Sequence, residues 1–247
     1  MKIGICIVDY GDPKLLENCL DSLSAYRDVD CSPNEYWCMQ GNTQINIFDC
    51  NKENIGFSKA NNKLVQTQLK DNNIDWIWLL NNDTTVEPST LDNLLIQLPQ
   101  YPKNIGVVGF KILSMDNPDL IHHAGTYDCF PAGVHKSGSV KLRQHEKQSF
   151  EKWVTFASVL IRREVFEQIG LLDPQMFNYF SDSDFCFRAR YAGFKVAYEP
   201  CFVIKHKIGQ SQSPSPAQMK ILQRDSLVFQ NKWINGKLFF DLDRELV

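Results

Sequence analysis

Three aspartates, Asp9, Asp49 and Asp83, stand at the ends of short apolar runs in the first third of the chain. The clearest run, residues 76–80, ends in two asparagines and then Asp83. In an open α/β sheet, ligands bind beyond the carboxyl ends of the strands. We therefore expect the three carboxylates to lie along one sheet edge. Aspartate is also common in plain turns, and for Asp9 and Asp49 that interpretation stays open.

An acidic sheet edge needs a cation before it can hold a phosphate. Mg²⁺ is usually held by one or two carboxylates together with phosphate oxygens of a substrate. The chain has no GxGxxG and no GxxxxGK[ST] loop, which are the usual phosphate cradles. Gly56 offers only a tight turn before a helix. The sequence therefore predicts a diphosphate ligand bridged by Mg²⁺ or Mn²⁺ at Asp83.

A further carboxylate, Asp182, lies in the segment FNYFSDSDFCFRARYAGF. Ser181 is expected to cap a helix here, with Asp184 as the acid of a capping box. Asp184 and Arg188 are spaced to pair along one helix face, whereas Asp182, two residues before Asp184, points elsewhere. A carboxylate at a helix start among aromatic residues is a candidate general base.

His206 follows a short apolar run and could ligate a metal through its neutral imidazole. The other four histidines show no HExxH-like spacing; they are His122, His123, His135 and His145. A lone histidine is more often structural, and from the residues alone this is the simpler interpretation of His206.

Composition restricts the class of protein. A formal net charge of −3 over 247 residues leaves no basic footprint for nucleic acid. The apolar runs are too short to span a bilayer, and the start MKIGICIVDYGD is typical of a first strand, not of a secretory signal. The eight cysteines include no CxxC pair. We therefore expect reduced, structural cysteines in a cytoplasmic protein.

Strand and helix patterns alternate along the chain, which indicates a doubly wound α/β fold with a mainly parallel sheet. The expected strands are residues 3–8, 45–48, 76–80, 105–110, 154–161 and 203–205. The expected helices start with Asp12 and Ser58 as caps, or cover residues 89–98, 163–169, 182–191 and 218–233. Residues 113–150 show no clear period, which is typical of a functional loop or of small local elements.

Four blocks, in this order and spacing, resemble the family 2 glycosyltransferases. They are ENIGFSKANN, WIWLLNNDTTVEPSTLDNL, the long block from FASVLIRREVFEQIG to FKVAYEP, and VIKHKIGQS. The resemblance extends from Ile3 to about Trp233 and is nearest to bacterial rhamnosyltransferase-like members that build surface polysaccharide. It implies a GT-A fold, with a Rossmann-like sheet flanked by helices, in one domain of residues 1–247. The nucleotide-binding half is expected at about 1–112, and the half with acceptor site and catalytic base at about 113–247.

The resemblance also implies a reaction and its residues. A sugar, with rhamnose as the candidate, would move with inversion from a dTDP- or UDP-linked donor to a hydroxyl of a glycan or lipid-linked acceptor. Asp182 matches the family's catalytic base, Asp83 the metal-binding acid of its DxD-type motif, and His206 a histidine often found near the metal. Residues that match nucleotide-binding positions are Asp9, Tyr10, Asp49, Asn54, Gly56, Asn81 and Asp83. A lipid-linked acceptor further implies peripheral association with the inner face of a membrane.

Three positions depart from the family pattern. Asn81 stands where the commoner motif has an acid, so one carboxylate fewer faces the metal. Ser181 replaces the usual Glu and removes a charge beside Asp182. The segment that reads the nucleotide base is displaced, and either Asp30 or Asp49 could fill it; the better strand precedes Asp49.

Two other functions stay open. One is a nucleotidyltransferase that makes a sugar nucleotide on a similar sheet, although the segment VDYGDPKLL is acidic and short where a basic, Gly-rich triphosphate loop is expected. The other is a catalytically silent nucleotide-sugar or glycan-binding module of the same fold, which Asn81 and Ser181 favour. For the glycosyltransferase, acceptor choice is expected to depend on residues 113–150 and the terminal helix.

Overall fold

The computed structural model of the protein describes residues 1–23, 43–129, 132–207 and 215–234; Asp30, one candidate for reading the nucleotide base, lies outside these ranges. The first strands are β1 (Ile3–Asp9), β2 (Thr43–Asp49), β3 (Trp76–Asn81), β4 (Thr84–Val86) and β5 (Ile105–Ser114). The later strands are β6 (Leu120–His123), β7 (Thr126–Tyr127), β8 (Val134–His135), β9 (Gly138–Ser139), β10 (Ser149–Phe150), β11 (Ser158–Arg162) and β12 (Lys195–His206). The α-helices are α1 (Pro13–Leu23), α2 (Phe57–Gln68), α3 (Pro88–Gln97), α4 (Arg163–Ile169), α5 (Ser181–Tyr191) and α6 (Pro216–Trp233).

One large sheet draws strands from both halves of the chain. Its main order is β10-β12-β5-β11-β3-β1-β2. β1 runs parallel to β2 and β3, and β12 runs parallel to β5. β11 lies between these two parallel groups and is antiparallel to both of its neighbours. The α/β prediction is confirmed, and the antiparallel β11 is the feature that the alternating pattern did not indicate.

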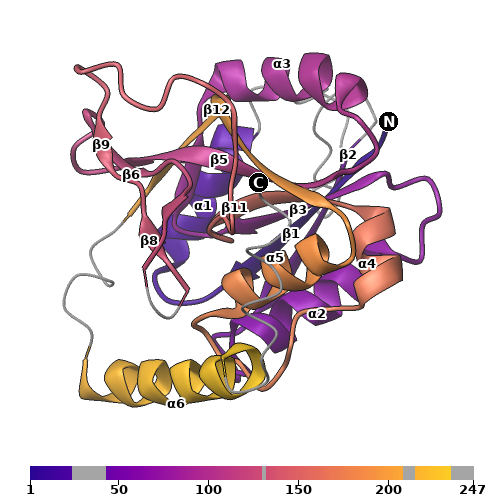
Figure 1. Cartoon of the computed structure of the whole chain (residues 1–247), viewed down its shortest axis with the longest axis vertical. Helices are drawn as coiled ribbons and strands as arrows, with labels where there is room; N and C mark the ends of the chain where they lie inside the picture. Colours follow the sequence, from indigo (N-terminus) through magenta and orange to yellow (C-terminus); the bar gives the residue numbers. More distant parts are fainter. Residues whose placement is uncertain (24–42, 130–131, 208–214, 235–247) are drawn as a thin grey trace.

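Helices cover both faces of this sheet (Figure 1). Buried residues of α1 and α3 pack on one face, and those of α2, α4, α5 and α6 pack on the other. β3 lies in the middle, and all of its residues from Trp76 to Leu80 are buried. A strand covered on both faces reads as a continuous apolar run and not as an alternating one. This explains the unbroken run before the two asparagines.

Two predicted helix caps are wrong. α2 begins at Phe57 with Gly56 as its N-cap and no side-chain cap, so Ser58 lies inside the first turn and is buried. α5 begins at Ser181 itself, after Phe180, and has no capping box. In both cases a residue with positive φ, Gly56 at 85° and Phe180 at 63°, turns the chain into the helix. A backbone turn of this kind leaves no place for a serine cap.

The predicted pair of Asp184 and Arg188 is confirmed, with Nε donating to Oδ2 at 2.9 Å. Asp184 is fully buried, and its other oxygen accepts from Trp233 Nε1 at 2.9 Å. Lys232 Nζ also lies 2.8 Å from that oxygen. Asp184 therefore joins α5 to α6. None of the described helices is long and apolar enough to cross a membrane.

Other boundaries differ by a few residues. The strand expected at 154–161 begins only at Ser158, because residues 156 and 157 form a turn. The strand expected at 203–205 is the end of the longer β12. Residues 113–150 hold the small strands β6 to β10, so the expectation of small local elements is confirmed for the described part of this stretch.

Candidate active site

The ends of β1, β2 and β3 bring polar side chains together. Asp9 and Asp49 are partners in the parallel register of β1 and β2. Asn82, just after β3, donates from Nδ2 to Asp9 Oδ1 and to the Tyr10 carbonyl, both at 3.0 Å. Asn51 Nδ2 donates to the other Asp9 oxygen at 3.0 Å. The Asp9 carboxylate is thus occupied in joining three chain segments at the sheet edge.

Asp83 and His206 meet although they are far apart in the sequence. β4 pairs antiparallel with β12, and this places Thr84 opposite His206. The Lys207 amide donates to the Asp83 carbonyl at 3.0 Å, which closes the pairing. As a result, His206 Nε2 lies 3.1 Å from Asp83 Oδ1.

This pair fits a divalent cation. The contact lacks hydrogen-bond geometry: Asp83 Oδ1 and His206 Nδ1 are buried without a hydrogen-bond partner. Two neighbouring ligands of an octahedral ion with bonds of about 2.1 Å lie about 3 Å apart, close to the observed separation. The described residues contain no cluster of three or more acidic, histidine or cysteine groups that could hold a metal alone. A cation here would complete its shell with ligand phosphates or water, as Mg²⁺ commonly does.

Asn54 and Gly56 form the turn into α2. Asn54 Oδ1 accepts from the Gly56 amide at 3.0 Å. Gly56 has φ 85°, and a Cβ added there would lie 2.6 Å from the Phe177 ring. Only glycine therefore allows the start of α2 to approach the Phe177 segment so closely.

A cavity of about 920 Å³ lies beside this turn and beside Asp83. Of the residues predicted to bind nucleotide or metal, those that line it are Tyr10, Asn54, Gly56, Asn81, Asp83 and His206. Asp9 and Asp49 do not line it and lie at the neighbouring strand ends. The described lining residues include no lysine or arginine. A diphosphate in this cavity would therefore need a cation to offset the Asp83 charge.

Asp182 lies in the first turn of α5 and lines a second cavity, of about 520 Å³. Its Oδ1 accepts from the Ser183 amide at 2.8 Å. Burial raises the pKa of Asp182 to about 6, and hydrogen bonds from the Ser183 and Phe156 backbone partly offset this. A carboxylate with this pKa is ionised at neutral pH and is still a competent proton acceptor, which suits a general base.

The turn before Asp182 is strained. Phe180 has a left-handed backbone, which is uncommon for a bulky residue. Its ring stacks on Phe229 of α6, with centroids 5.2 Å apart. The same helix supplies Asp225, a buried carboxylate that accepts from the amides of Asn178 and Tyr179 at 2.8 and 3.0 Å. Packing and hydrogen bonds from α6 therefore hold the unusual turn that aims Asp182 at the cavity.

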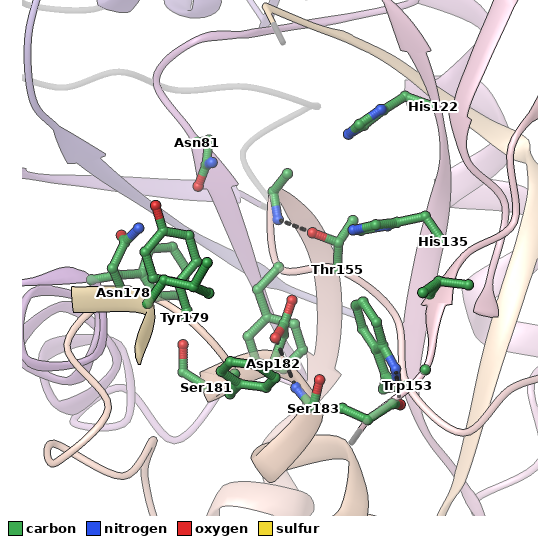
Figure 2. A pocket seen from close by; sticks show the side chains of 18 of the residues that line it. Asn81, His122, His135, Trp153, Thr155, Asn178, Tyr179, Ser181, Asp182 and Ser183 are labelled. Atoms are coloured by element: carbon green, nitrogen blue, oxygen red, sulfur yellow. Dashed lines mark hydrogen bonds between the residues drawn. The ribbon is translucent and has the colours of Figure 1, made fainter. Parts of the chain in front are cut away.

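The two cavities adjoin each other. Both are lined by Phe57, Asn81, Asn178, Tyr179 and His206. Figure 2 shows Asp182 at one side of the smaller cavity and Asn81 at another, with a wall of histidines facing them. Asp182 lines the smaller cavity, Asp83 lines the larger one and His206 lines both, so the predicted base and the predicted metal site face adjoining spaces.

Several lining residues were missed from the sequence. Asn82, buried between Asp9 and Tyr10, was named only as part of the triplet NND, although a third polar residue at a buried strand end was a usable signal. His122, His135 and Trp153 also line the smaller cavity. Their positions depend on the small strands of residues 113–150, for which the sequence showed no period.

The fold is that of a GT-A glycosyltransferase. Residues 41–225 match the family described as "Glycosyltransferase like family 2", which is three quarters of the chain, so the protein belongs to this family. The predicted family resemblance is confirmed.

Curated relatives carry related names. An N-acetylglucosaminyl-diphospho-decaprenol L-rhamnosyltransferase of Mycobacterium tuberculosis is 26% identical over 155 residues, which cover 58% of this chain and 50% of that protein. The low-salt glycan biosynthesis hexosyltransferase Agl10 of Haloferax volcanii is 25% identical over 202 residues, which cover 76% of this chain and 61% of that protein. The matched part of the chain thus spans between half and three fifths of these relatives.

Solved structures show the same fold at low sequence identity. GalNAc-T7, crystallised with UDP, GalNAc and Mn²⁺, has a TM-score of 0.61 at 16% identity, over 83% of this chain and 43% of that chain. The mannosyltransferase PcManGT of Pyrobaculum calidifontis, in complex with GDP-Man and Mn²⁺, has a TM-score of 0.55 at 14% identity, over 95% of this chain and 64% of that chain. The GT-A prediction is confirmed by these likenesses.

Proposed function

We propose that this protein is an inverting, divalent-cation-dependent glycosyltransferase. It transfers a sugar from a nucleotide-diphosphate donor to a hydroxyl of a glycan or lipid-linked acceptor. The observation that carries the proposal is the pairing of two sites across adjoining cavities. Asp83 and His206 face the larger cavity, and Asp182, with its raised pKa, faces the smaller one.

The larger cavity holds the nucleotide diphosphate in this proposal. Its rim carries Tyr10 and Asn54 next to the turn at Gly56, and Asp49 at the end of β2 is kept as the candidate for reading the base. Asp83 and His206 hold the cation. The cation, when bound, offsets charge on the diphosphate and so helps it to leave.

Asp182 takes the proton of the acceptor hydroxyl. The hydroxyl oxygen forms the new bond to the anomeric carbon as its proton moves to the Asp182 carboxylate. The bond from that carbon to the diphosphate breaks, and its electron pair leaves with the diphosphate oxygen. One displacement from the face opposite the leaving group inverts the configuration. A positioned base of this kind contributes about 10²–10⁴-fold to the rate.

The names of the relatives suggest the substrates to test first. The Mycobacterium tuberculosis relative is named for L-rhamnosyl transfer to a lipid-linked sugar diphosphate. We therefore propose dTDP-linked rhamnose as the first donor and a lipid-linked sugar as the first acceptor, in surface polysaccharide synthesis. A cytoplasmic location at the inner membrane face and a single-domain organisation belong to the same proposal.

A donor screen tests this function. The full chain is incubated with dTDP-, UDP- and GDP-linked sugars, with Mg²⁺, Mn²⁺ or a chelator, and released nucleoside diphosphate is measured. We expect release from at least one donor, only with a divalent cation. Cation-dependent nucleotide binding without any release, in the presence of acceptor mixtures, would instead favour the silent binding module, for which Asn81 and Ser181 are the sequence argument. Pyrophosphate formation from a nucleoside triphosphate and a sugar phosphate would favour the nucleotidyltransferase.

A further inference from the structure

The wall of the smaller cavity opposite Asp182 contains a chain of hydrogen bonds through two histidines. The Thr155 amide donates to His123 Nε2 at 3.3 Å. His123 Nδ1 and His135 Nδ1 lie 2.6 Å apart. His123 is completely buried behind the wall, whereas His135 lines the cavity together with His122.

This chain determines where the imidazole protons lie. A backbone amide can only donate, so His123 Nε2 must carry a lone pair, and the single proton of the neutral ring is on Nδ1. His123 Nδ1–H then donates to His135 Nδ1, which must also carry a lone pair. The proton of His135 is therefore on Nε2, the one nitrogen left to face the cavity. Burial holds the pKa of His123 well below its usual range, in agreement with a neutral ring.

His135 is also held in place by its neighbours. Lys136, the next residue, pairs with the buried carboxylate of Glu151, with Nζ 2.7 Å from Oε1. Glu151 also accepts from the Thr126 amide at 2.8 Å, in the strand that pairs with His135. The Trp153 ring packs edge-on against the His135 ring, with centroids 5.2 Å apart. These contacts hold the His135 ring in the pairing of β7 with β8.

The lining of this cavity indicates what would accept that hydrogen bond. Among the described lining residues there is no lysine or arginine, and Asp182 supplies a negative charge. A phosphate without a cation would therefore be repelled here. Neutral donors and acceptors dominate the polar lining, including Asn81, Thr155 and Tyr179. Such a surface suits the hydroxyls of an uncharged sugar.

We infer that His135 is a specificity-determining residue that donates an Nε2–H hydrogen bond to a hydroxyl of the acceptor sugar. The inference rests on the proposed function, since it states which part of the substrates the smaller cavity holds. Asp182 takes the proton of the attacking hydroxyl, and His135 holds another hydroxyl of the same sugar against the opposite wall. His123 acts as a positioning residue, since it fixes the tautomer of His135 without reaching the cavity.

The tautomers can be measured without any substrate. Long-range proton–nitrogen NMR on histidine-labelled protein separates the two neutral forms of each ring, and single variants assign the signals. We expect the proton of His135 on Nε2 and that of His123 on Nδ1. A proton of His135 on Nδ1 would overturn the inference, because the ring would then present an acceptor to the cavity.

Binding of acceptor-like sugars tests the second part. The probes are p-nitrophenyl glycosides of common neutral monosaccharides, titrated into the full chain. The expected effect of His135→Phe is an increase in glycoside Kd by about threefold to tenfold, the worth of one hydrogen bond. His135→Gln should bind glycosides nearly as well as the wild type, because the glutamine amide donates from a similar position. His145→Asn is the matched control, since His145 lies in the same segment, outside the cavity lining.

The outcomes separate this inference from the proposed function. If His135→Phe binds glycosides as the wild type does, or if no glycoside binds the wild type, His135 does not hold a neutral sugar. The wild type and His135→Phe should bind nucleotide with the same affinity. If His135→Phe loses nucleotide affinity as well as glycoside affinity, His135 lies at the donor, and the assignment to the acceptor is overturned. If glycosides bind through His135 while no nucleotide sugar is ever turned over, the proposed function fails and the sugar site stands.

Discussion

The two adjoining cavities differ in how their walls are made. The larger one is bordered by strand ends and short turns, namely the segments around Tyr10, Gly56 and Asn81–Asp83, and on its other side by residues 177–179 and the start of α6. The smaller one is walled by the hairpin that carries His135, by Trp153 and by the strained start of α5. Sheet topology positions the first set, whereas contacts between distant side chains position the second. The larger cavity therefore carries the charge of Asp83, and the smaller one carries oriented neutral groups around the Asp182 carboxylate.

Asp182→Asn should have the largest effect and should act on the smaller cavity alone. The amide keeps the shape and cannot accept a proton, so transfer should fall by about 100-fold or more. Nucleotide affinity should be unchanged, because Asp83 lines only the larger cavity and Asp182 lines only the smaller one. Initial rates and calorimetric nucleotide titrations measure the two effects. Wild-type turnover in this variant would place the base elsewhere.

Asp184→Asn is the matched comparison for Asp182→Asn. Asp184 is fully buried and contacts Arg188, Trp233 and Lys232. Removing one member of a buried ion pair costs about 3 kcal/mol. We expect a lower free energy of unfolding in denaturant titrations, with turnover per folded molecule close to wild type.

Asp83→Asn should act on the larger cavity alone. Loss of a carboxylate ligand is expected to weaken cation-dependent binding of nucleoside diphosphate by at least about tenfold. Stability should change little, because Asp83 Oδ1 makes no hydrogen bond in the fold. Calorimetry with and without Mn²⁺ checks this, and Asp12→Asn, an exposed acid just after the neighbouring strand β1, is the control. Unchanged Mn²⁺-dependent affinity would remove Asp83 from the metal site.

The pH dependence of transfer should report Asp182. Because burial raises its pKa to about 6, Asp182 is protonated below that pH and cannot act as a base. The rate at saturating substrates should therefore fall by about tenfold per pH unit below pH 6 and level off above it. In Asp182→Asn the residual rate should lose this acid limb. A wild-type rate that stays flat down to pH 5 would contradict the assignment.

His206→Gln should have the smallest effect. A neutral imidazole contributes less to a cation than a carboxylate does, so we expect a loss of nucleotide affinity of a few-fold, below that of Asp83→Asn. The same Mn²⁺ titrations compare the two variants directly. An equal or larger loss than in Asp83→Asn would reverse the ranking of the two ligands.

The difference between groups positioned by sheet topology and groups positioned by distant side-chain contacts also explains what the sequence could predict. Continuous apolar runs and turn residues specified β1, β3 and α4, and the polar residues after the strands marked Asp83 because parallel strands end at one edge. Asp182 was found by elimination, since Asp184 had a structural partner on its own helix. The register of β4 with β12, which brings His206 to Asp83, is not written in any local pattern. The expectation that His206 lies near the metal came only from the family resemblance.

The failures also have physical causes. Ser58 and Ser181 looked like caps because the sequence does not show that Gly56 and Phe180 turn the chain with positive φ. A positive φ costs glycine little energy. Phe180 adopts it with support from the ring of Phe229, a contact between residues far apart in the chain. The positions of His123 and His135 could not be predicted for the same reason. His123 and His135 are joined through hairpin pairing and the buried Glu151, and neither leaves a periodic signal.

The pairing of β4 with β12 has a consequence for folding and ligand-linked stability. Asp83 and His206 come from opposite halves of the chain, so the proposed cation site is complete only after β12 has added to the sheet. Contacts between such distant segments form at a high cost in loop entropy, and they tend to form late. A cation–nucleotide complex that requires both residues binds only the fully assembled sheet. It therefore stabilises the whole molecule against unfolding by mass action. When the complex dissociates, this stabilisation is lost from both halves of the chain at once.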